Sequence, residues 1–149
     1  ISLRPERYSH EIICETGEFV VNLTNRALAY ATDWCGVKSG RDFDKFQQMH
    51  LTPAASVKIA APGIEESPVS IECRVKDRIP LGTHDLFIAE VLSVDVDERY
   101  LDAKGRFDMK KADLLAYSHG EYYTLGDKIG KFGYSVARKP AAGAKKKRK

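Results

Sequence analysis

Cysteine is scarce in this sequence, and its spacing does not match a metal site or a disulfide framework. The 149 residues include three cysteines and four histidines, with no C-x-x-C and no H-x-x-x-H pair. An odd number of widely spaced cysteines argues against structural disulfides. We therefore expect no metal site and a protein of the reducing cytoplasm. The expected free thiols are Cys14, Cys35 and Cys73.

Long apolar runs are also absent. No stretch approaches the roughly 20 residues that a membrane-spanning helix needs, so a spanning helix is excluded. The length suits one domain with a core of its own. The chain does not begin with Met, and Ile1–Leu3 are typical of the end of a strand whose beginning is missing.

Positive charge is unevenly distributed. Seven of the 24 basic residues lie in the last 12 positions, and the remainder of the chain carries 17 basic and 21 acidic groups, a net charge of −4. We predict a folded domain over residues 1–137 and a disordered basic tail over 138–149. A small barrel that binds nucleic acid through this tail is a remote alternative, because the body is acidic.

The first half of the sequence predicts short helices around one strand. Ser9 is a suitable N-cap for a helix through Glu15, and Gly17 is a typical helix stop. The apolar run Glu18–Leu23 predicts a buried strand. Thr24 and Asn25 offer caps for a second helix, roughly 26–34, and a further helical turn is expected within residues 43–49.

The second half has the period of strands. Apolar and polar residues alternate over 69–76, so Glu72 should face solvent, and a longer strand follows over 84–98. The even-numbered residues of the longer strand are apolar and should face the core, with the exception of Glu90. At Glu90 we favour a β-bulge near Ala89 over a buried carboxylate. The glycine- and aromatic-rich stretch 116–136 should be irregular and wrap closely over another surface. The pattern predicts a mainly β protein with short inserted helices, in a small antiparallel barrel.

Positive charge and a hydroxyl meet where the first strand turns into the first helix. Arg4 and Arg7 flank this turn, and Ser9 lies at the helix start. Free N–H groups at a helix N-terminus, the helix dipole and an arginine fork all favour an anion, most often a phosphate.

Two further segments carry weaker signals. His84 follows a Gly-Thr turn at the start of a strand, where a barrel rim would meet a ligand. The loop "KSGRDFDKF" carries Ser39, Arg41 and Lys45. No catalytic triad and no paired carboxylates are apparent.

Four segments together resemble the flavin reductase-like family with the FMN-binding split barrel, which includes flavoredoxin-like flavoproteins. They are "RPERYSHEIICETGEFVVNL", "DWCGVKSGRDFDKF", "GTHDLFIAEV" and "DLLAYSHGEYYTLGDKIGKFGYSV". The resemblance runs from Ile1 to Val136. It implies a Greek-key split β-barrel, usually a homodimer, with FMN near the subunit interface.

The resemblance also assigns expected roles to individual residues. Arg4, Arg7 and Ser9 would hold the FMN phosphate, Ser39 and Lys45 would contact the flavin, and His84 would lie beside the nicotinamide or flavin ring. Family members begin with roughly forty more residues, so we expect the N-terminal strands of the barrel to be missing from this chain.

The resemblance implies an NAD(P)H:flavin oxidoreductase. In such enzymes the cofactor carries the chemistry, and hydride passes from the nicotinamide to the flavin. The reduced flavin would serve an acceptor protein or a monooxygenase. The alternative is a flavoredoxin-like FMN electron carrier without a nicotinamide site of its own.

Overall fold

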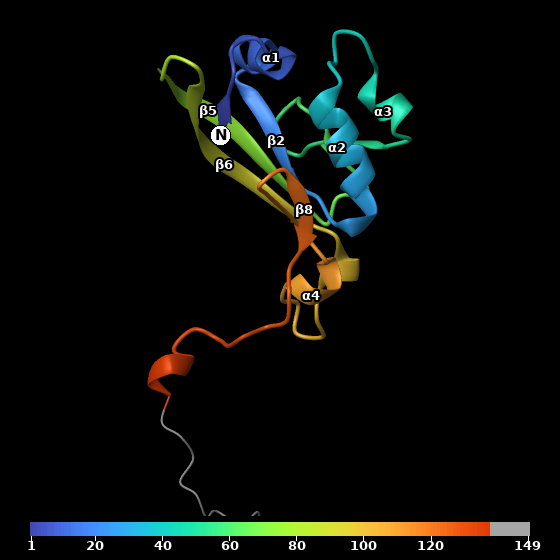
Figure 1. Cartoon of the computed structure of the whole chain (residues 1–149), viewed down its shortest axis with the longest axis vertical. Coiled ribbons are helices and arrows are strands. Elements are labelled where there is room, and N and C mark those ends of the chain that lie inside the picture. The colour runs from blue at the N-terminus through green and yellow to red at the C-terminus, as the bar shows by residue number, and fades with distance from the viewer. Residues whose placement is uncertain (138–149) are drawn as a thin grey trace, which may run out of the picture.

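Four antiparallel strands form the main sheet of the computed structural model, which describes residues 1–137 (Figure 1). The strand order is β1-β6-β5-β2. The strands are β1 (Ser2–Leu3), β2 (Glu18–Leu23), β5 (Val69–Pro80) and β6 (Asp85–Val96). The mainly β prediction is confirmed, and the predicted basic tail lies outside the described residues.

The long hairpin of β5 and β6 contains two irregularities. The ladder shifts between Val75 and Asp77 of β5, opposite Ala89 and Ile88, and again between Glu72 and Cys73. The extra residue near Ala89 is therefore Lys76 on the neighbouring strand. Glu90 is exposed and its carboxylate lies 2.6 Å from the ammonium of Lys76, so no carboxylate is buried at this position.

The residues of β6 that face the core differ from those expected from the sequence. Phe87 is 2% exposed, whereas Ile88 and Val94 are 46% and 54% exposed. The sequence-based assignment of the even-numbered residues to the core is thus wrong at Ile88 and Val94. In the first part of β6 the odd-numbered residues Asp85 and Phe87 are the buried ones, so the inward phase is the opposite of the predicted one there.

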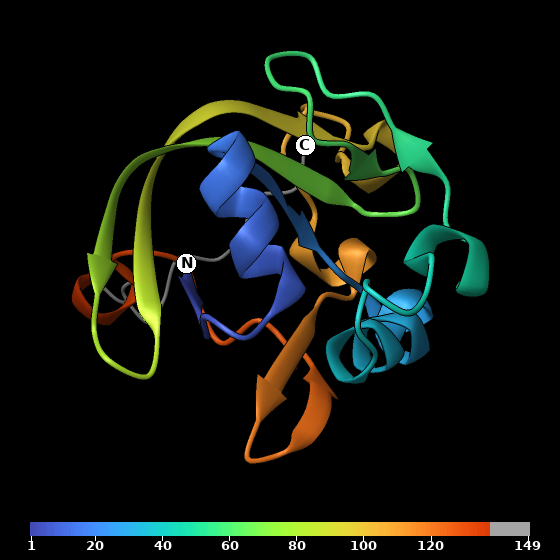
Figure 2. The same ribbon diagram turned by 90° about the horizontal axis from the view of Figure 1, so that it is seen from above.

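Helix α1 (Tyr8–Thr16) lies within the curve of the sheet (Figure 2). Its residue Ile13 packs against Phe19, Cys73 and Phe87, and this cluster forms the core of the domain. The helix begins one residue earlier than Ser9, with Arg7 at the N-cap position and no side-chain cap. The prediction that Ser9 caps the helix is therefore wrong. Gly17 ends the helix at φ +70°, as predicted.

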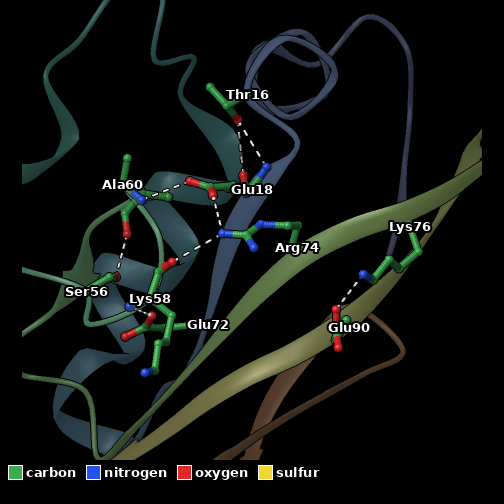
Figure 3. Close-up of polar contacts among 10 residues, drawn as sticks. Thr16, Glu18, Ser56, Lys58, Ala60, Glu72, Arg74, Lys76 and Glu90 are labelled. Carbon is green, nitrogen blue, oxygen red and sulfur yellow. Dashed lines mark hydrogen bonds and ion pairs between the residues drawn. The ribbon is translucent and has the colours of Figure 1, made fainter.

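Glu72 is buried, contrary to the prediction from strand alternation. Only 1% of it is exposed, because the loop of residues 55–61 covers it. Its two carboxylate oxygens accept the backbone N–H groups of Val57 and Lys58, each at 2.7 Å (Figure 3). These bonds replace the hydration that the carboxylate loses on burial.

The remaining elements are short. They are η1 (Arg26–Leu28), α2 (Ala29–Val37), α3 (Lys45–Gln48), β3 (Pro53–Ala54), β4 (Gly63–Ile64), η2 (Glu98–Tyr100), α4 (Met109–Ala112), β7 (Leu115–Ser118), β8 (Glu121–Thr124) and η3 (Tyr134–Val136). The side chain of Asn25 accepts the N–H of Leu28 at 3.2 Å and caps η1, which continues into α2, as expected from the sequence.

The glycine- and aromatic-rich stretch is only partly irregular. Its first part forms the β7–β8 hairpin, and the chain after Thr124 extends away from the body as an arm (Figure 1). The prediction of an irregular segment is therefore wrong for this first part. It overlooked the residues with high strand propensity on both sides of His119 and Gly120. Within residues 1–137, no helix is long and apolar enough to cross a membrane.

Candidate functional site

An open cavity of about 610 Å³ lies between the start of α1 and the segment that joins α2 to α3. Its lining includes four of the five residues predicted to bind a cofactor: Arg7, Ser9, Ser39 and Lys45. The fold therefore brings two distant segments of the chain to one place. The volume lies within the range of about 300–1,000 Å³ that is usual for small-molecule sites.

The first wall of the cavity is the N-terminus of α1. The N–H of Arg7 donates to the carbonyl of Arg4 at 3.0 Å, and this turn leads directly into the helix. The side chains of Arg7 and Ser9 are exposed. The first N–H groups of a helix have no partner within it, and its dipole favours negative charge. This wall can bind an anion.

The second wall is a tight turn between α2 and α3. The hydroxyl of Ser39 accepts the N–H of Arg41 at 3.1 Å, and its carbonyl accepts the N–H groups of Asp42 and Phe43 at 3.2 Å. The ammonium of Lys45 donates to the carbonyl of Cys35 at 2.6 Å. These bonds hold Ser39 and Lys45 in place at the cavity.

Contacts that the sequence did not predict join the two walls. Arg41 forms an ion pair with Glu11, and its guanidinium carbon lies 4.7 Å from the centre of the Tyr8 ring. A Cβ at Gly40 would lie 3.2 Å from a ring carbon of Tyr8, a tight contact that would require the ring to shift, so glycine favours the close approach of the turn to the helix. In the sequence, Gly36 and Gly40 are typical of a loop at this place, but they do not indicate which segment it contacts.

The lining combines positive charge with apolar surface. Arg7, Lys38 and Lys45 contribute three cations against the one carboxylate of Glu6, and Ile12 and Phe43 contribute apolar surface. Such a lining suits a ligand with an anionic group and an apolar body. Burial raises the pKa of the Cys35 thiol, and the nearby Lys45 only partly offsets this effect, so the thiol in the lining is neutral near pH 7.

Arg4 and His84 are not among the residues that line the cavity. Arg4 lies exposed in the turn before α1. His84 is half-buried at the β5–β6 turn, where its Nδ1 lies 3.0 Å from the Thr83 hydroxyl and its carbonyl accepts the N–H of Leu81. The next residue, Asp85, pairs with Leu3, which does line the cavity.

The family model of the flavin reductase like domain matches residues 1–126. The chain belongs to this family. The match covers both walls of the cavity and the whole of the main sheet.

Structures of family relatives share the fold. The flavoredoxin of Desulfovibrio vulgaris (Miyazaki F) is 31% identical with a TM-score of 0.84, over 91% of this chain and 73% of that one. A Shewanella frigidimarina protein described as a flavin reductase with a split barrel domain is 26% identical with a TM-score of 0.78, over 90% of this chain and 69% of that one. The predicted split-barrel fold is thereby confirmed.

One relative with a named activity aligns with a smaller part of the chain. An NADPH-flavin oxidoreductase of Streptomyces viridifaciens is 31% identical over 94 residues, which make up 62% of this chain and 47% of that protein.

Proposed function

We propose that this flavin reductase-like protein binds FMN in the cavity and holds the FMN phosphate at the N-terminus of α1. The observation that carries the proposal is the convergence of Arg7, Ser9, Ser39 and Lys45 on one cavity. Arg7 and the first helical N–H groups would contact the phosphate, with Arg4 adding charge from the preceding turn. Ser39, Lys45 and the apolar lining would contact the rest of the cofactor.

We propose further that the protein is an NAD(P)H-dependent flavin reductase. FMN, when bound, supplies the acceptor for a hydride from the nicotinamide, and the protein supplies binding and orientation. This proposal is supported by the similarity to the Streptomyces viridifaciens relative, whose name is NADPH-flavin oxidoreductase. His84 is the proposed positioning residue for the nicotinamide, because its neighbour Asp85 pairs with the cavity residue Leu3.

A flavoredoxin-like electron carrier is the second candidate. Two observations favour it: the similarity to the D. vulgaris flavoredoxin and the position of His84 outside the cavity lining. A carrier would bind FMN in the same cavity but would receive electrons from another protein instead of from a nicotinamide.

Rapid mixing of the full-length FMN-loaded protein with NADH or NADPH separates the two candidates. In a reductase, the nucleotide reduces the flavin and its absorbance is lost within one turnover. The rate of this loss should saturate as the nucleotide concentration rises. A flavin that stays oxidised with both nucleotides, but is reduced by dithionite, would identify the carrier and reject the reductase.

The proposed reductase would act as a homodimer in the cytoplasm and would pass reduced flavin to an acceptor protein or a monooxygenase. Exposed apolar residues on the C-terminal arm support the dimer, since Ile129 and Val136 are 91% and 84% exposed. The three free thiols support a reducing compartment.

A further inference from the structure

A cysteine, a histidine and an arginine meet beside α1, and none of the three lines the cavity. Cys14 and His10 lie one turn apart on α1, and Arg78 comes from β5. The guanidinium of Arg78 donates to the sulfur of Cys14 at 3.0 Å. The same sulfur lies 3.7 Å from Nδ1 and 3.9 Å from Nε2 of His10, so the imidazole ring is beside it.

Asp85 holds this cluster in place from β6. Its carboxylate lies 2.8 Å from Nε2 of His10, and the two side chains are only 10% and 12% exposed. The same carboxylate oxygen lies 3.8 Å from Nε of Arg78. The ring of His10 also packs edge-on against Phe87, with 5.4 Å between the ring centres. The neighbours of the sulfur are therefore fixed by the sheet.

These neighbours favour reaction at Cys14. The thiolate is the reactive form of cysteine, and an adjacent arginine or imidazolium stabilises it. Cys14 is exposed, so a small reagent can reach the sulfur. Burial raises the pKa of the other two thiols, Cys35 and Cys73, which disfavours their thiolate form. The chain thus contains two less reactive thiols as internal references.

We propose that Cys14 is a thiol-modification site that reacts with small-molecule disulfides. The Cys14 thiolate attacks one sulfur of the disulfide, the bond between the two sulfurs breaks, and a mixed disulfide forms on Cys14. The departing thiolate leaves with the electron pair of the broken bond and takes up a proton. Arg78 stabilises the attacking thiolate, and His10 lies close enough to receive the thiol proton.

The test uses the full-length protein and glutathione disulfide, with peptide mass mapping of the modified cysteine over time. Cys14 should be modified before Cys35 and Cys73. Arg78→Gln should slow the reaction of Cys14 roughly tenfold near pH 7, because it removes the cation beside the sulfur. Arg78→Lys keeps the positive charge and should retain most of the rate.

Arg74→Gln is the matched control. Arg74 lies on the same strand, and its side chain is 48% exposed, as is that of Arg78, but it pairs with Glu18. This variant should leave the Cys14 rate unchanged. Equal rates in Arg78→Gln and Arg74→Gln, or earlier modification of Cys35 or Cys73, would overturn the proposal.

The pH profile distinguishes stabilisation of the thiolate from support of the fold. The groups around the sulfur are Arg78, His10 and, behind them, Asp85. The rate deficit of Arg78→Gln should shrink at strongly alkaline pH, because the thiolate then forms without a neighbouring cation. A deficit that persists at alkaline pH would mean that Arg78 shapes the helix and does not act on the sulfur.

Discussion

The ammonium group of Lys45 donates a hydrogen bond to the main-chain carbonyl of Cys35 at 2.6 Å. This bond joins the start of α3 to the last part of α2 and closes the turn that carries Ser39. It also places a cation in the cavity lining, facing the N-terminus of α1. The lysine therefore has a structural partner and two N–H groups left for a ligand.

Lys45→Met should weaken FMN binding roughly tenfold to a hundredfold, because a hydrogen bond from a charged donor contributes about 1.5–3 kcal/mol. Fluorescence titration of the full-length apoprotein with FMN measures the change. Lys104→Met removes a lysine outside the cavity lining and should have no effect. Unchanged affinity with a lower unfolding temperature would mean that Lys45 only joins the two helices.

Arg7→Ala should weaken FMN binding roughly tenfold to a hundredfold, because it removes a charge-assisted contact to the phosphate. Riboflavin, which lacks the phosphate, should bind equally well to the variant and the wild type. Arg4→Ala provides the comparison: Arg4 does not line the cavity, so its loss should cost less. Equal losses for FMN and riboflavin would show that Arg7 supports the fold and not the phosphate.

Local patterns predicted the parts of the fold that depend on near neighbours. The strand Glu18–Leu23 and the Gly17 stop follow from propensity and backbone freedom, and both are present. Arg7, not Ser9, occupies the N-cap position: Arg7 is extended (φ −76°, ψ 137°) and closes a turn with Arg4, and its carbonyl already accepts the N–H of His10. The capping propensity of Ser9 therefore did not decide where the helix begins.

The parts that the sequence did not predict depend on distant segments. Burial of Glu72 requires the N–H groups of a separate loop, which the alternation in β5 does not reveal. Contact between the cavity walls likewise requires Arg41 to reach Tyr8 and Glu11 on α1. For the cavity residues, the residue types and the family resemblance indicated the site, and the fold supplied the proximity.

Glu72→Gln should destabilise the protein far more than Glu90→Gln. The amide keeps the shape of Glu72 but places an NH₂ group against one of two backbone donors, leaving that buried donor without an acceptor (Figure 3). Glu90 makes only an exposed pair with Lys76, which contributes little. Thermal unfolding of both variants at pH 7 measures the difference, and equal stability losses would contradict the argument.

Glu72 should also contribute to loss of stability in acid. Burial alone would raise its pKa, but hydrogen bonds, the largest of them from the N–H groups of Val57 and Lys58, together outweigh burial, so the pKa lies below its ordinary value. Its contribution is then complete above the unfolded value of about 4.3 and is lost as the pH falls through the lower folded value. Glu72→Gln should show a shallower fall in unfolding temperature below that pH, and an unchanged slope would refute this.

Phe132→Asp should weaken the proposed homodimer. The Phe132 side chain is fully exposed on the C-terminal arm, and a charge there would oppose burial against a second subunit. Sedimentation of the full-length protein over a concentration series measures the dissociation constant. Tyr30→Asp, at a 76% exposed aromatic on α2, is the matched control and should leave assembly unchanged. A wild-type protein that sediments as a monomer at micromolar concentration would refute the dimer.

His84→Ala tests the proposed contact between this residue and the nicotinamide. The imidazole lies half-buried at the β5–β6 turn, where Gly82 adopts φ +86° and leaves backbone that a ligand can approach. Hydride transfer depends steeply on the distance between the two rings, so misplacement can lower the rate by about a hundredfold. The variant should therefore reduce its flavin more slowly with NAD(P)H and bind FMN almost normally.

Reduction by dithionite separates this role from a structural one. Dithionite needs no nucleotide docking, so its rate should be the same in His84→Ala and in the wild type. Thr83→Ala is the matched variant, because it removes the hydroxyl beside Nδ1 but keeps the imidazole. If His84 only stabilises the turn, both variants should lose stability and keep the wild-type rate with NAD(P)H. That outcome would remove His84 from the site and would leave FMN binding to the α1 cavity unaffected.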